Sequence, residues 1–244
     1  MPVTSASVQP ASPSFIPMKT TELLNKISGR GLHALYRFTR SPHLFSPAMV
    51  SVELTFTNLG TEELMDIRVG QKTLPPGMSM HDFATISVLP VNVTLPGTVG
   101  VDFSDSTQPV SFTITVGGTQ SNQVTIKAPV GELIRAVTMP EPLFISEQSK
   151  LRGMNEHSAV VNLLPSCNDQ RAICQRVFEV SNVASIPSTD SKCLRFAGQT
   201  LSSKSLVLVT VMTLENEQVN ISVNCEKMVI GSMLLNEIKS HLRN

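Results

Sequence analysis

The chain has 244 residues and a mass of 26.4 kDa, a size that fits one large domain or two domains of ordinary size. Its 19 basic and 19 acidic side chains give no formal net charge, which argues against a dedicated nucleic-acid binder because such proteins carry a basic excess. Apolar residues make up 41% of the chain, enough to build a core. No apolar run reaches the ~18 residues of a membrane span, and no signal peptide is evident.

The chain starts with a segment that offers little to bury. Residues 1–17 are rich in Ser and Pro and contain no charged side chain, which predicts an extended linker or tail. A short helix is expected next, because Leu23, Leu24 and Ile27 would share one helical face before Gly29 ends it.

The stretch from Lys19 to Arg40 is locally basic, with five positive residues against Glu22 alone. Such a cluster can contact anionic lipid headgroups or an acidic partner segment. The alternative, which we favour, is that these side chains form the solvated face of a helix and the first strand. The residues of this candidate basic patch are Lys26, Arg30, Arg37 and Arg40.

Residues 32–128 have the pattern of short strands. Apolar and polar residues alternate from Val50 to Thr57 and again from Val110 to Val116, and this two-residue period predicts strands with one buried face. Turns are expected at Asn58-Leu59-Gly60, Pro96-Gly97 and Gly117-Gly118, among others. Shorter strands are expected at 64–69, 78–88, 91–95, 99–103 and 124–126. About eight such strands predict an immunoglobulin-like β-sandwich over residues 19–130.

The pattern changes after Pro129-Val130-Gly131 to a mixture of helices and strands, which predicts a smaller α+β platform domain over residues 131–244. The fold class is therefore mixed, a sandwich followed by a platform with an antiparallel sheet and helices. Helices are expected at 141–151, 169–180 and 232–242, the last capped by Ser232. Strands are expected at 159–164, 205–214 and 219–225, the last two joined by a hairpin through 215–217.

No motif for catalysis or for binding a metal or a cofactor is found. Asp102 and Asp105 flank Ser104, but consecutive polar residues at a strand end are more typical of a turn. His157 and Cys167 could be drawn as a thiol protease pair, yet no third group would orient the imidazole, and a solvated loop is expected for His157. We expect no enzyme activity, no cofactor, no metal and no small-molecule substrate.

The four cysteines fall in the second half of the chain, and their spacing does not suit a zinc site. Free thiols in a reducing compartment are favoured. The alternative hypothesis is a secreted immunoglobulin-like adhesion fragment with disulfides and with glycans at Asn92 and Asn220. A further alternative is a membrane-surface or regulatory role for the basic patch within a larger complex.

Several blocks of residues carry a resemblance to a known family. They are LL at 23–24 with ISGRGL at 27–32, DFSDSTQ at 102–108, PVGEL at 129–133, GMNEHSAV at 153–160, RFAGQT at 195–200, LVTV at 208–211 and EKMVIGSMLLNEIK at 226–239. In these blocks the stretch from Lys19 to the C-terminus resembles the C-terminal appendage, or ear, of the beta subunit of adaptor protein complex 3.

The resemblance implies a sandwich and a platform at the end of a flexible hinge, of which residues 1–18 would be the last piece. It implies a cytosolic protein on Golgi and endosomal membranes and coated vesicles that recruits accessory trafficking proteins while cargo is sorted toward lysosomes and related organelles. The other adaptor subunits would be contacted through a trunk that this chain lacks. Related clathrin-adaptor appendages grip peptides with a pocket built around a Trp; this chain has no Trp, so no such pocket is assigned.

Overall fold

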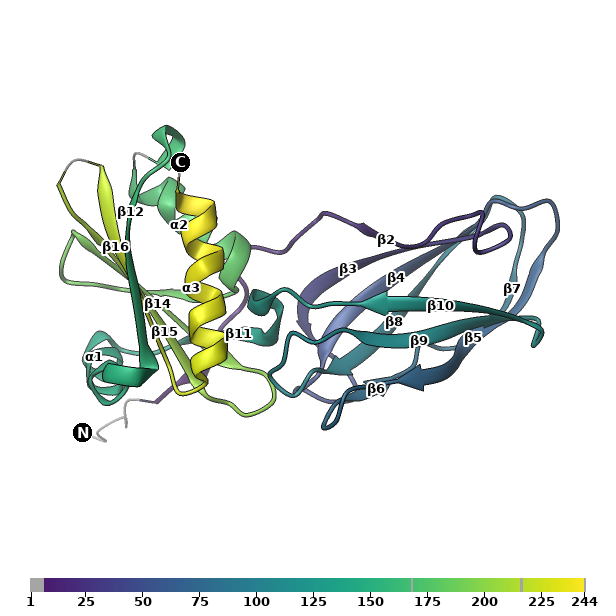
Figure 1. Cartoon of the computed structure of the whole chain (residues 1–244), viewed down its shortest axis with the longest axis horizontal. Helices are drawn as coiled ribbons and strands as arrows, with labels where there is room; N and C mark the ends of the chain where they lie inside the picture. The colour runs from purple at the N-terminus through teal and green to yellow at the C-terminus, as the bar shows by residue number, and fades with distance from the viewer. Residues whose placement is uncertain (1–6, 168, 216, 244) are drawn as a thin grey trace, which may run out of the picture. The chain divides into compact units, whose positions relative to one another are not determined.

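The computed structural model of the chain describes residues 7–167, 169–215 and 217–243, and it divides into two compact units (Figure 1). The sandwich unit comprises Ile16–Pro129. The platform unit comprises Val130–Asn244 together with the N-terminal segment up to Phe15. Among the described residues, no helix is both long and apolar enough to cross a membrane.

The sandwich unit consists of two antiparallel sheets, in the strand orders β2-β3-β4-β8-β6 and β10-β9-β5-β7. This confirms the immunoglobulin-like β-sandwich predicted from the two-residue periods. The strands are Thr21–Leu24 (β2), Leu32–Pro42 (β3), Val50–Asn58 (β4), Leu64–Thr73 (β5), Ser79–His81 (β6), Ile86–Leu89 (β7), Thr94–Asp102 (β8), Val110–Val116 (β9) and Gln120–Ile126 (β10).

The core of the sandwich unit lies between the two sheets. On β9, Val110, Phe112, Ile114 and Val116 are buried while the residues between them are partly exposed, so the strand presents one face to the core. On β4, Val52, Leu54 and Phe56 are fully buried in the same alternation. Facing sheets that each contribute alternate residues make a continuous core.

The helix expected over residues 20–29 is wrong. Leu24 is buried on β2 while Ile27 is 84% exposed, so the two side chains do not share one face. The chain turns instead at Asn25, whose side-chain oxygen accepts hydrogen bonds from the backbone N–H groups of Ile27 (3.1 Å) and Ser28 (2.9 Å). An Asn that bonds to the backbone just ahead of it favours a turn over a helix.

The turn expected at Pro96-Gly97 is also wrong, because both residues lie inside β8 and pair with Thr55 and Leu54 of β4. A Cβ at Gly97 would lie 3.0 Å from the ring of Phe56 and 3.3 Å from Phe83. The glycine therefore allows two core aromatics to approach the strand backbone, which is a common reason for glycine within a strand.

The platform unit is built on one seven-stranded sheet, in the order β1-β11-β14-β15-β16-β12 with β13 also paired to β14. It confirms the predicted smaller α+β domain. Its strands are Gln9–Pro10 (β1), Ile134–Thr138 (β11), Glu156–Asn162 (β12), Ala184–Ile186 (β13), Cys193–Thr200 (β14), Leu206–Thr213 (β15) and Gln218–Cys225 (β16), and its helices are Glu141–Lys150 (α1), Gln170–Ser181 (α2) and Met228–Leu242 (α3).

The helices cover the two faces of this sheet unequally. Phe178 on α2 packs edge-on against Phe196 of β14, with ring centroids 5.6 Å apart, and α3 lies over β12 and β16. On the opposite face, Phe144 of α1 packs with Ala197 and Leu208. Successive residues of a strand point to opposite faces, so α2 and α3 share one face and α1 lies on the other.

The platform unit differs from the sequence predictions at several places. The segment predicted as linker contributes β1, which pairs with β11 at the edge of the sheet. The last helix begins at Met228 with Lys227 as its N-cap, so Ser232 lies inside the helix and is not its cap. His157 lies in β12 and not in a loop. Of the expected hairpin at 215–217, residue 216 lies outside the described residues.

Candidate functional site

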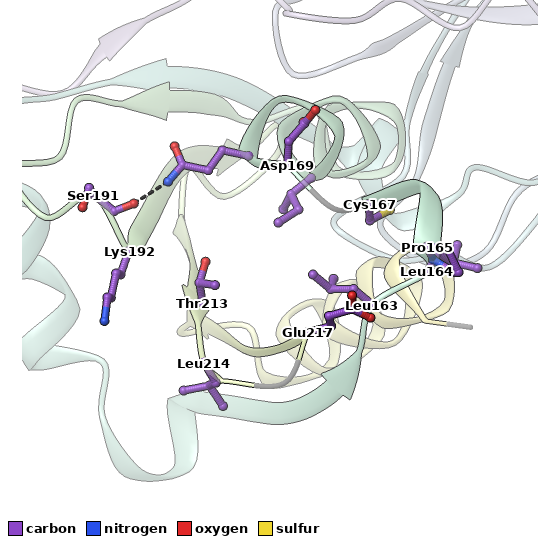
Figure 2. Close-up of a pocket in the computed structure, with 12 residues that line it drawn as sticks. Leu163, Leu164, Pro165, Cys167, Asp169, Ser191, Lys192, Thr213, Leu214 and Glu217 are labelled. Atoms are coloured by element: carbon purple, nitrogen blue, oxygen red, sulfur yellow. Dashed lines mark hydrogen bonds between the residues drawn. The ribbon is translucent and has the colours of Figure 1, made fainter.

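A pocket of about 270 Å³ opens on the platform unit near the N-terminus of α2 (Figure 2). It is formed by four chain segments: the end of β12 with the following turn, the start of α2, the residues before β14, and the end of β15 with the residues after it. The lining residues are Leu163, Leu164, Pro165, Cys167, Asp169, Gln170, Ile173, Ser191, Lys192, Thr213, Leu214 and Glu217.

Backbone hydrogen bonds hold these segments together. The N–H of Leu163 donates to the carbonyl of Glu217 (2.9 Å), and that of Leu164 donates to the carbonyl of Leu242 at the end of α3 (2.9 Å). Asp169 caps α2 by accepting from the N–H of Ala172 (2.6 Å). The pocket is therefore framed by secondary structure and helix capping, which makes it a preformed feature of the unit.

The chemistry of the pocket is an apolar interior with a charged rim. Cys167 and Ile173 are buried at its base, while Leu214 is 40% exposed on its wall. Lys192 on one side and Glu217 on another are exposed at the rim. The volume lies just under the ~300 Å³ at which small-molecule sites begin, so the pocket suits one or two apolar side chains of a peptide better than a metabolite.

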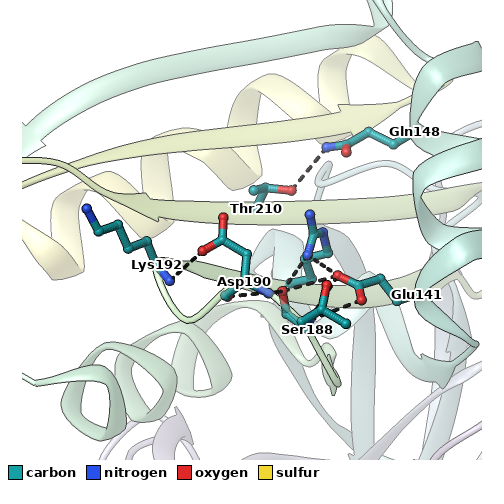
Figure 3. Close-up of polar contacts among 8 residues, drawn as sticks. Glu141, Gln148, Ser188, Asp190, Lys192 and Thr210 are labelled. Atoms are coloured by element: carbon teal, nitrogen blue, oxygen red, sulfur yellow. Dashed lines mark hydrogen bonds and ion pairs between the residues drawn. The ribbon is translucent and has the colours of Figure 1, made fainter.

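Beyond the pocket, the face of the sheet that carries α1 is held by a network of polar contacts (Figure 3). At the start of α1, Glu141 forms an ion pair with Arg195 of β14 and accepts hydrogen bonds from the Thr189 N–H (3.1 Å) and the Ser188 hydroxyl (3.2 Å). Gln148 donates to Thr210 and Asn224, both at 3.0 Å. These contacts fix α1 on the sheet.

The surroundings of this network shift the pKa values of Glu141 and Cys193. Partial burial opposes the charge on Glu141, but hydrogen bonds from Thr189 and the positive charge of Arg195 outweigh it and hold the pKa of Glu141 below its ordinary value. Burial raises the pKa of the neighbouring Cys193 thiol. Cys193 is therefore a protonated, weakly nucleophilic thiol.

The sandwich unit carries a larger hollow, of about 740 Å³, beside the loop that follows β3. Phe45 stacks on His81 with ring centroids 4.5 Å apart, and His43 lies 5.2 Å from His81. Leu44 at the tip of this loop is fully exposed. This hollow resembles the platform pocket in composition, because both combine an exposed leucine side chain with polar groups.

The structure spreads the predicted basic patch along β3 and does not gather it. Lys26 and Arg30 lie in the turn before β3, and Arg40 lies near the far end of the strand. At a rise of about 3.3 Å per residue, the part of β3 from Leu32 to Arg40 spans about 26 Å, and Arg30 lies before its start. Arg37 between them forms a two-pronged contact with Glu53, at 3.1 and 2.9 Å. Anion binding by these four residues stays a prediction.

The structure places the candidate catalytic residues in a turn, in a strand and beyond the end of that strand. The Ser104 N–H donates to the Asp102 side chain (2.9 Å), and Ser104 and Asp105 both have positive φ, so these residues form the turn that the sequence indicates. His157 packs against Gly231 of α3 near the start of β12, whereas Cys167 lies beyond the end of that strand. The described residues bring together no group of three or more His, Cys, Asp or Glu side chains suited to a metal.

Sequence reasoning did not predict the platform pocket. Its residues come from segments spread between Leu163 and Glu217, and only Asp169, a good helix cap at the start of a periodic run, carries a local signal. Of the cysteines, Cys167, Cys174 and Cys193 are free thiols, and Cys225 is buried on β16.

A sandwich unit and a platform unit are the arrangement that the resemblance to adaptor appendages implies, and comparison with known proteins agrees. A family model for the C-terminal region of the clathrin-adaptor complex-3 beta-1 subunit matches residues 1–108. A second, described as the AP-3 complex subunit beta-1, C-terminal domain, matches residues 131–242. The two matches fall on successive parts of the chain and together cover most of it.

Curated relatives give the same result. Mouse AP-3 complex subunit beta-1 is 43% identical over 235 residues, which are 96% of this chain and 21% of that protein. Mouse AP-3 complex subunit beta-2 is 38% identical over 89% of this chain and 20% of that protein. AP3-complex subunit beta-A of Arabidopsis thaliana is 24% identical over 94% of this chain and 28% of that protein.

The chain belongs to the family of C-terminal regions of AP-3 complex beta subunits. It spans about a fifth of the length of the mouse relatives that it matches.

Proposed function

We propose that the chain is the non-enzymatic protein-interaction appendage of a vesicle-coat adaptor subunit. In this role it recruits accessory or regulatory proteins at the cytosolic face of Golgi and endosomal membranes, while cargo is sorted toward lysosomes and related organelles. Its partners are proteins: accessory trafficking factors and the other subunits of an adaptor complex. Membership of the AP-3 beta-subunit family supports the proposal.

The observation that carries the proposal is the preformed platform pocket, with Ile173 and Cys167 at its base and charged residues at its rim. An apolar side chain of a partner peptide would enter the pocket, and polar residues flanking it would meet Lys192 and Glu217. A single anchor of this size gives weak binding. Many copies on one coat raise the effective affinity, because each further contact forms at high local concentration.

The test is capture of cytosolic proteins by the immobilised chain and two variants, read by mass spectrometry. Leu214→Glu places a charge on the apolar wall of the pocket, and because Leu214 is 40% exposed, the unit should stay folded. Leu44→Glu makes the same change at the fully exposed tip of the sandwich loop and is the matched control.

We expect the unmodified chain and Leu44→Glu to capture trafficking proteins, and Leu214→Glu to lose them by about tenfold, as for a change of about 1.4 kcal/mol at a binding anchor. Equal capture by all three chains would overturn the assignment of the pocket. Loss in Leu44→Glu alone would move the site to the sandwich hollow. If no folded chain captured any trafficking protein, the recruiting function itself would be wrong.

A further inference from the structure

The N-terminal segment of the chain occupies an edge of the platform sheet. Gln9 and Pro10 form β1, which pairs antiparallel with β11 in the register Gln9 with Thr138 and Pro10 with Val137. The Ala11 N–H donates to the carbonyl of Ala136 (2.9 Å), which extends the contact by one residue. In the strand order, β1 is the outermost strand on this side of the sheet.

One side chain anchors the segment. Val8 is partly buried and packs on the apolar cluster beneath α1, together with Leu143 of that helix and Leu206 of β15. The fully buried members of this cluster include Phe144 and Leu208. Val8 therefore fills a notch whose walls come from the helix and the sheet, while Gln9 and Pro10 remain exposed.

Pro10 suits its place in the register. Because Ala11 faces Ala136 as a hydrogen-bonded pair, Gln9 also points its backbone groups toward β11 and Pro10 points its own away from it. Proline has no N–H to offer, and at this outward position none is needed. The sheet edge therefore recognises three features of the segment: its backbone hydrogen-bonding groups, a valine side chain and a proline two residues later.

The contact is small for a permanent part of a sheet. β1 has two residues, whereas its neighbour β11 has five, and residues 7–15 contain no charged side chain that could add an ion pair. Ordering an extended segment costs conformational entropy at each residue, and one half-buried valine offsets only part of it. Short, exposed segments with few contacts open readily.

We propose that the β11 edge and the Val8 notch form a binding groove for an extended peptide, and that residues 7–11 are its occupant in cis. The partner that fits is an uncharged, extended segment with the pattern Val-x-Pro, which would add to the sheet as a strand after displacing β1. This groove is distinct from the pocket at α2, so the inference stands whether or not that pocket binds a partner.

The test measures binding of a fluorescently labelled peptide with the sequence of residues 7–15 to the full chain. Val8→Asp introduces a charge into the apolar notch and should release the cis segment. Ser12→Asp adds the same charge at an exposed position of the same segment and is the matched control. If the cis segment fills the groove nine-tenths of the time, its release should raise the affinity for the peptide about tenfold.

We expect tighter binding to Val8→Asp than to the unmodified chain or Ser12→Asp, and no binding of a peptide in which Asp replaces the valine. Hydrogen exchange at the Ala11 amide should quicken in Val8→Asp and stay slow in Ser12→Asp. Equal affinity for all three chains would show that the peptide does not compete with β1 for the sheet edge, and no binding to any of them would show that β1 is a fixed cap. Either result would overturn the proposal. An Ala11 amide still protected in Val8→Asp would overturn the assignment of Val8 as the anchor.

Discussion

The two units bury their sheets in different ways. In the sandwich unit, each sheet covers the apolar face of the other, so a strand such as β9 has one buried and one solvated face. In the platform unit, a single sheet is covered on one face by α2 and α3, and on the other only in part, by α1.

The uneven cover of the platform sheet leaves apolar side chains exposed on it. On the face that carries α1, Met212 of β15 is 42% exposed and Val160 of β12 is 57% exposed, and both strands place these residues opposite Asn220 of β16. The α2 pocket and the Val8 notch belong to the same unit. Sheets that cover each other bury their apolar faces against one another, whereas a sheet with partial helix cover leaves apolar side chains at its surface.

The largest predicted effect tests whether the two cores are energetically separate. Phe112 in the sandwich and Phe144 under α1 are both fully buried, so truncation of either to Ala should cost about 3–5 kcal/mol of unfolding free energy. We expect Phe112→Ala to destabilise residues 16–129 alone and Phe144→Ala to destabilise residues 130–243 alone. Hydrogen exchange followed by mass spectrometry in increasing urea reports each unit separately. An equal loss in both units for either variant would show one cooperative core.

Two glycine substitutions should have smaller effects on stability, one through close packing and the other through backbone conformation. A Cβ at Gly131 would lie 1.9 Å from the carbonyl oxygen of Val180 on α2, so Gly131→Ala must displace backbone and should cost about 3 kcal/mol, the upper range for overpacking. Gly117 has φ of +59° with nothing within 4 Å, so Gly117→Ala should cost only about 1–2 kcal/mol of backbone strain in the sandwich. Urea titration of both variants tests this order, and a reversed order would contradict it.

The sequence predicts the strands of the sandwich unit better than those of the platform unit. The reason is how many faces of each sheet are covered. Alternation from Val110 to Val116 is strict because one face of that strand meets solvent, and the strand is confirmed. On β14, Phe196, Ala197 and Gly198 are all buried, because helices cover both faces there, and no alternation marks that strand. Around Leu24 the local turn at Asn25 replaces the expected helix, and the last helix begins at Met228, before the expected cap Ser232. The α2 pocket depends on contacts between distant segments that no single stretch encodes.

The smallest predicted effect concerns pH and again distinguishes the units. His43 is buried against Gly100, and burial together with the nearby His81 lowers the pKa of His43 below its ordinary 6.5. Its Nδ1 accepts a hydrogen bond from the Phe45 N–H (3.2 Å), which requires the neutral ring. Because the unfolded chain binds the proton more readily, the sandwich should lose stability as the pH falls below 6.5. Unit-resolved hydrogen exchange between pH 7.5 and pH 5, analysed after correction for intrinsic rates, measures this loss.

The stability of the platform unit should depend on pH in a different range, and the same experiment measures it. The pKa of Glu141 is held below its ordinary value of 4.5, so the stability from this carboxylate is present above pH 4.5 and is lost only as the pH falls through its folded value. His43→Gln removes this titrating group, so the stability of the sandwich unit should depend less on pH between 6.5 and 5. Glu141→Gln should leave the pH dependence of the sandwich unit in this range unchanged. A sandwich that weakens equally with and without His43 would show that groups other than His43 cause the loss.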